Sequence, residues 1–167
     1  MLFDRKLLDD ALAGLEPKVR AAMPEDADAV ASLLHELAIR EWNGPVAGMR
    51  ENVGKFLTAP SSSIILVVEH EHKVSGFVVL HTYPGVAEGA PVLYLDDIYV
   101  DEGLQNRGLG SALMSGVECV AAHVGACYVS LQTRRQNHAA HRFYERHGFT
   151  FHDDVVFERE IDASPET

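Results

Sequence analysis

The segment Leu104–Met114, with the sequence LQNRGLGSALM, constrains the fold of this chain more than any other stretch. It follows the apolar run VLYLDDIYV and passes at once into residues with helical spacing. Glycines at the start of a helix let the backbone approach a ligand closely, and the first N–H groups of a helix attract anions. The segment therefore predicts a strand, a tight turn and a helix, with an anion bound at the mouth of the helix.

The spacing of the glycines excludes two common phosphate-binding motifs. A dinucleotide-binding loop needs G-x-G-x-x-G, but Leu113 stands where the third glycine belongs. A Walker loop needs Gly-Lys followed by Ser or Thr, and the segment has no such tripeptide. What remains is Gln105-x-x-Gly108-x-Gly110, whose glycines let several N–H groups point at one pyrophosphate. Taken alone, this motif is also compatible with a strand-to-helix turn that binds nothing.

The hydrophobic pattern predicts an α/β protein, because helical and strand periods alternate along the chain. We expect helices at residues 4–14, from Pro24 onward, at 49–57, at 109–123 and at 137–148. We expect seven strands, at residues 18–23, 63–70, 74–83, 92–100, 127–133, 149–154 and 155–160, with a loop carrying Pro84, Gly85, Gly89 and Pro91 between the third and fourth.

Composition and charge narrow the classes of partner. The 167 residues suit one domain, and the net charge of −11, from 14 Lys and Arg against 25 Asp and Glu, disfavours nucleic acid and anionic membranes. The same charge favours cationic ligands. No apolar run reaches transmembrane length, and the charged N-terminus does not look like a signal peptide, so we expect a cytoplasmic protein.

Two signatures together resemble the GNAT superfamily of acyl-CoA N-acyltransferases. The first is Gln/Arg-x-x-Gly-x-Gly/Ala after a strand, as found above. The second is Asn-x-x-Ala-x-x-Phe-Tyr-x-x-x-Gly-Phe, which residues 137–149 match at every specified position. The resemblance extends over nearly the whole chain and includes VRAAMPEDADAVASLLHELA near its start. It implies a single N-acetyltransferase domain over residues 18–162. Helical spacing of apolar residues predicts a helical extension at 1–17, and the polar composition of residues 163–167 predicts a flexible tail. It also implies a mixed, mostly antiparallel sheet of about seven strands that splays at an acetyl-CoA site, and a homodimer.

Within the superfamily the chain most resembles the polyamine and diamine N-acetyltransferases. The likeness lies in LLHELA, in the loop around Tyr83 and Pro84, and in LYLDDIYV. Those enzymes more often have Glu-Asp where this chain has Asp96-Asp97. The resemblance thus implies a small polyamine or diamine as acceptor, with a shorter side chain at the position of the acidic residue.

Acetyl transfer to an amine makes demands that particular residues meet. An alkylammonium group has a pKa near 10.4, so removing its proton at pH 7 costs about 4–5 kcal/mol. By resemblance, Asp96 draws this proton through a water molecule, and Tyr144 protonates the leaving thiolate. Consecutive residues of a strand point to opposite faces, so Asp96 and Asp97 face one cleft only if a bulge redirects them. Asp97 is a candidate for binding the cationic end of a substrate.

The remaining site residues follow from the same resemblance. Pantetheine amides are expected to pair with main-chain groups of the central strand, and the pyrophosphate with amides of the glycine segment. The expected contacts of acetyl-CoA are Ile98, Tyr99, Val100, Gln105, Asn106, Arg107, Gly108, Leu109, Gly110, Ser111, Asn137 and Tyr144. Candidate acceptor residues are Trp42, Tyr83, Asp97 and His141, with His81 as a weaker one. No metal site is expected, because the nine histidines lack partners at zinc-ligand spacing.

The sequence therefore predicts an acetyl-CoA-dependent N-acetyltransferase that moves an acetyl group directly to a primary amine. Acceptors other than polyamines stay open, namely aminoglycosides, amino-acid derivatives and protein amines. A non-catalytic acyl-CoA-binding module is the alternative from another class. Such a module would keep the glycine segment but would not need Asp96 and Tyr144 together.

Overall fold

The computed structural model describes residues 3, 5–41, 44, 47–59 and 62–159 of the chain. The expected acceptor residue Trp42 and the expected tail at 163–167 lie outside these residues. The chain forms two compact units, Met1–Gln132 and Thr133–Thr167, each of which is described by itself. The sheet and all but one of the described helices belong to the first unit.

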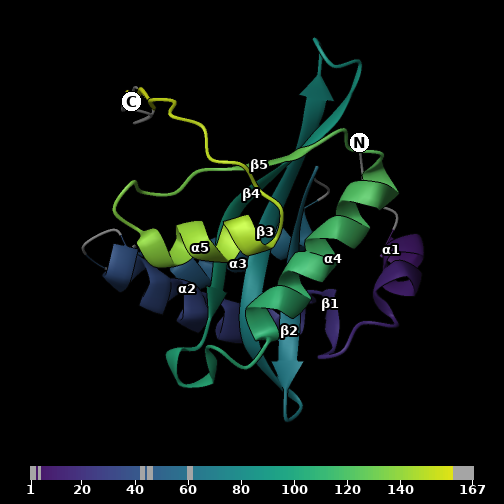
Figure 1. Ribbon diagram of the computed structural model, residues 1–167. Coiled ribbons are helices and arrows are strands. Elements are labelled where there is room, and N and C mark those ends of the chain that lie inside the picture. The colour runs from purple at the N-terminus through teal and green to yellow at the C-terminus, as the bar shows by residue number, and fades with distance from the viewer. Residues whose placement is uncertain (1–2, 4, 42–43, 45–46, 60–61, 160–167) are drawn as a thin grey trace, which may run out of the picture. The chain divides into compact units, whose positions relative to one another are not determined.

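A mixed five-stranded sheet forms the centre of the first unit (Figure 1). Its strands lie in sequence order and are β1 (Val19–Ala21), β2 (Ser63–His70), β3 (Lys73–Gly85), β4 (Ala90–Val100) and β5 (Val129–Leu131). The first four pair antiparallel, and β5 pairs parallel with β4. The expected class, a mixed and mostly antiparallel α/β sheet, is confirmed.

The expected number of about seven strands is too high for the described residues. Phe149 to Arg159 form no strand, and residues 151–159 are exposed. Their alternation of apolar and polar residues resembles a strand, but a strand needs a neighbour for its hydrogen bonds. The described part of the second unit contains no such neighbour, only helix α5 (His138–Arg146). The expected loop around Pro84 and Pro91 is also shorter than predicted, because these two residues pair with each other near the end of the β3–β4 hairpin.

Helices cover both faces of the sheet (Figure 1). Helix α4 (Leu109–Val124) packs on one face, and α2 (Ala27–Glu41) and α3 (Met49–Thr58) pack on the other. Short 3₁₀ turns, η1 (Pro24–Asp26) and η2 (Glu102–Leu104), precede α2 and follow β4. The layer between the sheet and the α2–α3 pair contains Ile65, Val67, Phe77, Val79 and Tyr99, together with apolar residues of both helices.

The N-terminal helix α1 (Arg5–Leu12) belongs to this core. Its Leu8 and Leu12 are fully buried, and the helix contacts α4 and β1. A Cβ added at Gly116 of α4 would lie 3.7 Å from Cδ2 of Leu12 and 2.9 Å from Cδ1 of Leu66. The extension expected from the sequence is therefore packed against the body of the first unit.

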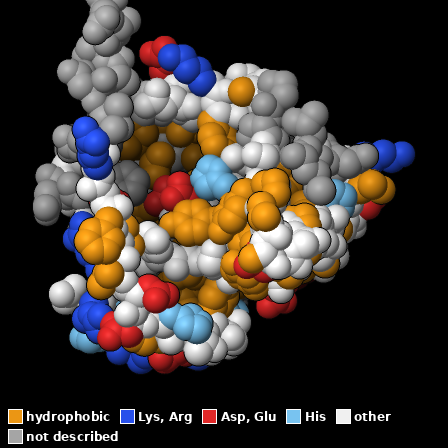
Figure 2. Space-filling model, turned by 90° about the horizontal axis from the view of Figure 1, so that it is seen from above, with side chains coloured by type: hydrophobic (Ala, Val, Ile, Leu, Met, Phe, Trp, Pro, Cys, Tyr) orange, Lys and Arg blue, Asp and Glu red, His pale blue; other side chains and the backbone are white. Residues whose placement is uncertain are grey.

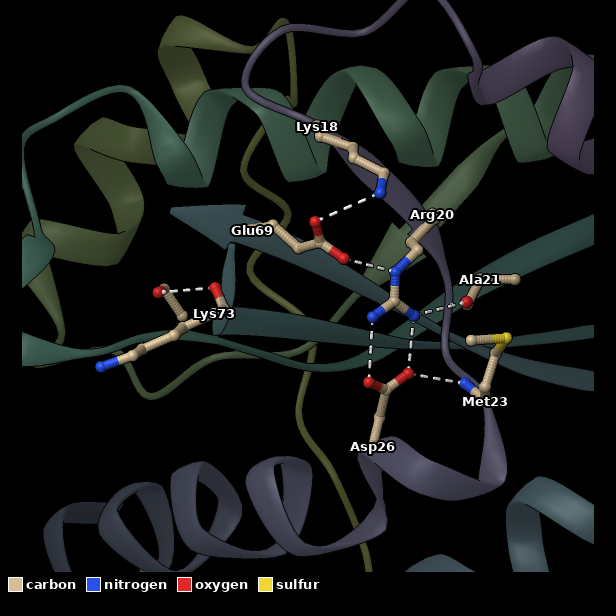
Figure 3. A network of polar contacts seen from close by, with 8 residues as sticks. Lys18, Arg20, Ala21, Met23, Asp26, Glu69 and Lys73 are labelled. Atoms are coloured by element: carbon tan, nitrogen blue, oxygen red, sulfur yellow. Dashed lines mark hydrogen bonds and ion pairs between the residues drawn. The ribbon is translucent and has the colours of Figure 1, made fainter. Parts of the chain in front are cut away.

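The side chain of Arg20 joins strand β1 to strand β2 and to the turn η1 (Figure 3). Arg20 on β1 donates from Nη1 and Nη2 to both carboxylate oxygens of Asp26, at 2.6 and 2.9 Å. Its Nε donates to Glu69 of β2 at 2.6 Å, and Lys18 forms an ion pair with the same carboxylate at 3.2 Å. The hydrogen bond from Arg20 holds the pKa of Glu69 below its ordinary value. The network fixes the entry of the chain into η1 and α2.

Candidate functional site

The two consecutive carboxylates lie at an irregularity of the central strand. Val79 of β3 pairs with Asp97, whereas the next residue, Leu80, pairs with Leu95. Asp96 is therefore an extra residue on β4 that has no partner on β3. This is a β-bulge, the feature that the sequence alone left open.

The bulge turns both carboxylates to the face covered by α2 and α3. Asp97 is opposite Val79, which packs in that layer, and residues opposite each other share a face. Asp96 reaches the same side, because its Oδ2 lies 3.2 Å from Nε2 of His81, two residues after Val79 on the regular strand β3. A regular strand would have separated the two groups.

The pair of carboxylates is electrostatically strained at neutral pH. Burial, and after it the negative charge of Asp96, raise the pKa of Asp97 to about 6, while His81 acts in the opposite direction. Burial together with the two carboxylates also raises the pKa of Tyr94 above its ordinary value. A carboxyl group that titrates near neutral pH inside a polar cluster is typical of a functional site.

His81 connects this cluster to a neighbouring strand. Ser63, the first residue of β2, lies opposite His81, and its Oγ is 2.6 Å from Nδ1 of the imidazole. Phe56 of α3 meets the same ring edge-on, with 6.1 Å between centroids. The view from above shows acidic and histidine side chains next to one another among hydrophobic ones, the mixture that this cluster contains (Figure 2).

Tyr83 belongs to the same face of the hairpin. It follows His81 by two residues on β3, and its side chain is exposed. Tyr94 of β4 pairs with His81, and Tyr83 pairs with Val92, so the two tyrosines are diagonal neighbours on adjacent strands. Of the expected acceptor residues, Tyr83 and Asp97 therefore lie on one face with Asp96 and His81.

Strand β4 loses its neighbour on one side at the bulge. Within the first unit, β5 pairs with Leu93, Tyr94 and Leu95 and then ends. No described strand of this unit pairs with residues 96–100 on that side, while β3 continues along the other. Alternate N–H and C=O groups of residues 96–100 therefore point to a sheet edge that can accept an extended ligand.

The three expected cofactor residues of β4 offer their main chain rather than their side chains. Tyr99 and Val100 are buried, and Ile98 is half-buried. The hydroxyl of Tyr99 donates to Glu36 of α2 at 3.3 Å, and burial together with this carboxylate raises the pKa of Tyr99 to about 12. The side chain of Tyr99 is thus buried and bonded within the protein, so only its main chain is free to contact a ligand at the strand edge.

The glycine segment forms the predicted turn into a helix. The side chain of Gln105 donates from Nε2 to the carbonyl of Val100 at 3.0 Å and so closes the turn after β4. Asn106 and Gly108 both have left-handed backbones, with φ of 60° and 84°. Leu109 is buried and anchors the first turn of α4 to the core.

The start of α4 suits an anion. Gly108 is the N-cap and forms no side-chain hydrogen bond with the helix, and a Cβ at this position would meet no atom within 4 Å. The first N–H groups of any helix have no acceptor within the helix. In α4 the first such hydrogen bond runs from the N–H of Ala112 to the carbonyl of Gly108, so the N–H groups before Ala112 have no acceptor within the helix. Gln105, Asn106, Arg107, Gly108 and Ser111 are exposed, and Gly110 is half-buried. The main-chain N–H groups of the segment are thus accessible, as the binding of a diphosphate requires.

Three expected site residues lie in the second unit, on or beside α5. Asn137 caps the helix, its side-chain oxygen accepting the N–H of Ala140 at 3.2 Å. His141 donates from Nε2 to the carbonyl of Arg134 at 3.1 Å. Tyr144 is half-buried and its ring packs against Phe143 and Phe149, with centroids 5.4 and 5.7 Å away. The helix was predicted from the sequence.

Sequence reasoning missed three residues that lie beside Asp96 or His81. Ser63, Tyr94 and Phe56 were not predicted as site residues, and only the strand and helix assignments covered them. The signal that finds Ser63 is its position opposite His81, which requires the register of the hairpin. Among the described residues, no group of three or more His, Cys, Asp and Glu side chains is arranged to hold a metal ion. None of the described helices has the length and apolar character to span a membrane.

Comparison with known proteins gives the class to which this fold and site belong. The sequence model of the acetyltransferase (GNAT) family matches residues 30–149, which include the bulged strand, the glycine segment and α5. The chain belongs to this family. It is an N-acetyltransferase, and acetyltransferases of the GNAT type use acetyl-CoA as the acyl donor.

Individual relatives agree on the activity and leave the acceptor open. The chain is 28% identical over 134 residues to the uncharacterized N-acetyltransferase YhfO of Bacillus subtilis, covering 78% of this chain and 88% of YhfO. It is 26% identical to an aminoglycoside N(6')-acetyltransferase type 1 of Stenotrophomonas maltophilia, covering 86% and 92% of the two chains. The crystal structure of a possible acetyltransferase from Clostridium difficile 630 superimposes with a TM-score of 0.76 at 18% identity, over 86% of this chain and 96% of the other.

Proposed function

We propose that this N-acetyltransferase transfers an acetyl group from acetyl-CoA directly to a primary amine of a small polycation, with a polyamine or diamine as the first candidate. The observation that carries the proposal is the β-bulge at Asp96, which directs two adjacent carboxylates to one face beside His81, Tyr83 and Tyr94. Two carboxylates and two phenol rings suit an ammonium group by charge and by cation–π attraction.

An aminoglycoside is the second candidate acceptor. It is favoured by the similarity to an aminoglycoside N(6')-acetyltransferase over most of both chains. Aminoglycosides also carry several ammonium groups, so the same carboxylates serve either class. Amino-acid derivatives and protein amines remain further candidate acceptors, but none of the residues around Asp96 and Asp97 favours them specifically.

The donor is held by the edge of β4 and by the mouth of α4. We assign the pantetheine contacts to main-chain groups of Ile98, Tyr99 and Val100, because the β4 edge is unpaired within the first unit at this point. We assign the diphosphate to residues 105–111, where the uncapped helix start and the space at Gly108 suit an anion. Asn137 is assigned a contact with the pantetheine arm through the part of its side chain that does not cap α5.

The chemistry then falls to two side chains. Asp96 accepts the proton of the ammonium group through water, which frees the lone pair of the amine to attack the thioester carbonyl. A backbone N–H of β4 polarises that carbonyl. Tyr144 donates its phenolic proton to the departing thiolate, a task that a neutral donor performs without bringing charge into the site. Asp97, Tyr83, Trp42 and His141 are assigned to acceptor binding.

Release of free thiol from acetyl-CoA in the presence of a panel of amines tests the proposed acceptor. We expect turnover with di- and polyamines, and weaker or no turnover with neutral amides and single amino acids. Tyr144→Phe should lower kcat at least about tenfold while the affinity for CoA stays nearly unchanged, because only the proton donor is lost. Tyr128→Phe is the matched control, since its hydroxyl is exposed and donates to Glu88 at 3.4 Å. Unchanged turnover in Tyr144→Phe would remove the proposed acid.

The assigned diphosphate site has its own test. Gly108→Val should abolish CoA binding, because valine strains a backbone with φ of 84° and fills the mouth of α4. Gly125→Val is the control, since Gly125 caps the other end of the same helix with φ of 67° and introduces the same kind of strain. If calorimetry finds equal CoA affinity in both variants, the diphosphate binds elsewhere.

We also propose a cytoplasmic homodimer, as the family resemblance implies. Light scattering coupled to gel filtration at several protein concentrations tests the dimer. A mass equal to one chain of 18.3 kDa at every concentration would contradict it.

A further inference from the structure

Three polar side chains from three adjacent strands form a continuous chain of hydrogen bonds. Ser63 of β2 contacts Nδ1 of His81 of β3 at 2.6 Å, and Nε2 of the same ring contacts Oδ2 of Asp96 of β4 at 3.2 Å. The three residues are far apart in the sequence, and all three lie on the face of the sheet that α2 and α3 cover. The chain ends on the carboxylate assigned above to the substrate proton.

With Asp96 ionised and His81 neutral, the chemistry of the groups gives the direction of both hydrogen bonds. An ionised carboxylate only accepts, so Nε2 of His81 must carry a hydrogen and donate it to Asp96. In the neutral imidazole Nδ1 is then an acceptor, and the hydroxyl of Ser63 donates to it. Ser63 therefore selects the tautomer of His81 that can hold Asp96.

The geometry leaves one oxygen of Asp96 outside the pair. His81 contacts Oδ2 and so restricts rotation of the carboxylate about its last bond, and among the described residues no hydrogen bond reaches Oδ1, which can accept one from a water molecule or an ammonium group. The imidazole itself is held on its other side by Ser63 and by the edge-on contact with Phe56. A base held in this way needs less reorganisation when the proton moves.

We propose that His81 and Ser63 are positioning residues of the acetyl transfer, which orient the carboxylate of Asp96 toward the amine through this Ser–His–Asp chain. The inference rests on the proposed function of Asp96 as proton acceptor. His81 touches Asp96 and not the reacting atoms, and Ser63 acts through His81.

Conservative variants of His81 separate positioning from packing. Glutamine places an amide N–H near Nε2 and keeps a donor for Asp96, whereas asparagine replaces only the Nδ1 side of the ring. We expect His81→Asn to lower kcat for the amine at least about tenfold without changing the KM for acetyl-CoA, and His81→Gln to recover most of that loss. His72→Gln, in the exposed turn between β2 and β3, is the control and should match the wild type. A merely structural histidine would lose the same activity in both variants.

Serine 63 gives a second test that needs no activity. We expect nitrogen NMR of the imidazole to show His81 as the Nε2–H tautomer in the wild type, with the Nδ1–H form increasing in Ser63→Ala. The resonance is assigned by its loss in His81→Gln. An Nδ1–H tautomer in the wild type would overturn the inference, whatever the enzyme acetylates.

The outcomes distinguish this inference from the proposed function. An enzyme that acetylates amines, but whose His81→Asn variant matches His72→Gln, would keep the function and overturn the positioning role. An enzyme inactive toward every amine would overturn the function, and with it the role of Asp96, even if the tautomer is as expected. Acetylserine at position 63, detected by mass spectrometry after mixing with acetyl-CoA, would make Ser63 a nucleophile and also overturn the inference.

Discussion

At the scale of the residue, the bulge brings together two charges that repel each other. Asp96 is exposed and paired with His81, whereas Asp97 is half-buried and has a pKa raised to about 6. Such a group is unfavourable to the folded state when it is ionised. The chain nevertheless contains it, on the side where a cationic acceptor is proposed to bind and to relieve the repulsion.

The first prediction concerns the cost of Asp97 to stability. Because its pKa is higher in the folded than in the unfolded chain, the folded state binds more protons between about pH 4 and 6, and the free energy of unfolding falls as pH rises through this window. Above pH 6 the full cost, at most about 3 kcal/mol, is present. We expect Asp97→Asn to raise the free energy of unfolding at pH 7 by about 1–3 kcal/mol and to flatten its dependence on pH between 4 and 6.

Urea denaturation of both proteins at several pH values measures this effect. Asp9→Asn, on the exposed side of α1, is the control and should leave the pH profile as in the wild type. If Asp97→Asn is no more stable than the wild type at pH 7, the buried carboxylate is compensated by contacts that its pKa does not reflect.

The pair Asp96-Asp97 was recognisable in the sequence, but the partners of Asp96 were not. A regular hairpin around Glu71 and His72 would place Ser63 opposite Leu80. A one-residue shift at Val68 and Glu69 moves His81 into that place, and a second shift, at Asp96, turns the carboxylate toward it. Each shift is set by packing of whole strands rather than by a local pattern, so periodicity alone could not predict it.

At the scale of the element, α4 determines how the proposed diphosphate site is presented. Its N-terminus carries the glycine turn, and its middle packs so closely on the sheet that Gly116 is needed there. A Cβ at Gly116 would lie 2.9 Å from Cδ1 of Leu66 and 3.0 Å from Cγ1 of Val19. The contact therefore sets the distance of α4 from β1 and β2.

Two helical glycines give opposite predictions for the same substitution. Gly116→Ala should lower the free energy of unfolding by about 1–3 kcal/mol, because the added methyl group overpacks the interface of α4 with the sheet. Gly54→Ala in α3 should raise it by about 0.5–1 kcal/mol, because no atom lies within 4 Å of the new Cβ and alanine favours the helix. Thermal and denaturant unfolding measure both. Equal effects of the two changes would mean that helix propensity alone decides.

The elements that the sequence predicted best are those with a strong local signal. The apolar, β-branched run at 63–70 and the glycine-bounded helix at 109–123 match β2 and α4 within one residue. Two other segments carry misleading signals. Pro84 and Pro91 suggest a loop but are paired in the hairpin. Residues 149–159 alternate like a strand but have no partner strand among the described residues of their unit. Strand formation depends on neighbours that a local pattern does not contain.

At the scale of the whole molecule, the excess of acidic residues bears on how an acceptor arrives. The formal net charge is −11, so a polycation approaches through a field that attracts it. At 0.1 M salt, charges more than about 10 Å apart are largely screened, whereas at 0.01 M the range extends to about 30 Å. Steering by the whole chain and the proposed binding by Asp96 and Asp97 should therefore respond differently to salt.

The last prediction uses this difference. We expect kcat/KM for a triamine acceptor to fall about three- to tenfold between roughly 20 and 500 mM potassium chloride, because long-range attraction is screened. A monoamine acetylated by the same enzyme should lose much less, since it carries one charge and feels mainly the nearby carboxylates. Initial rates at low acceptor concentration give both values, with acetyl-CoA saturating so that the salt sensitivity of the donor does not enter. Equal losses for the two amines would show that the acceptor is recognised by local contacts alone. A rise with salt for the triamine would contradict a cationic acceptor.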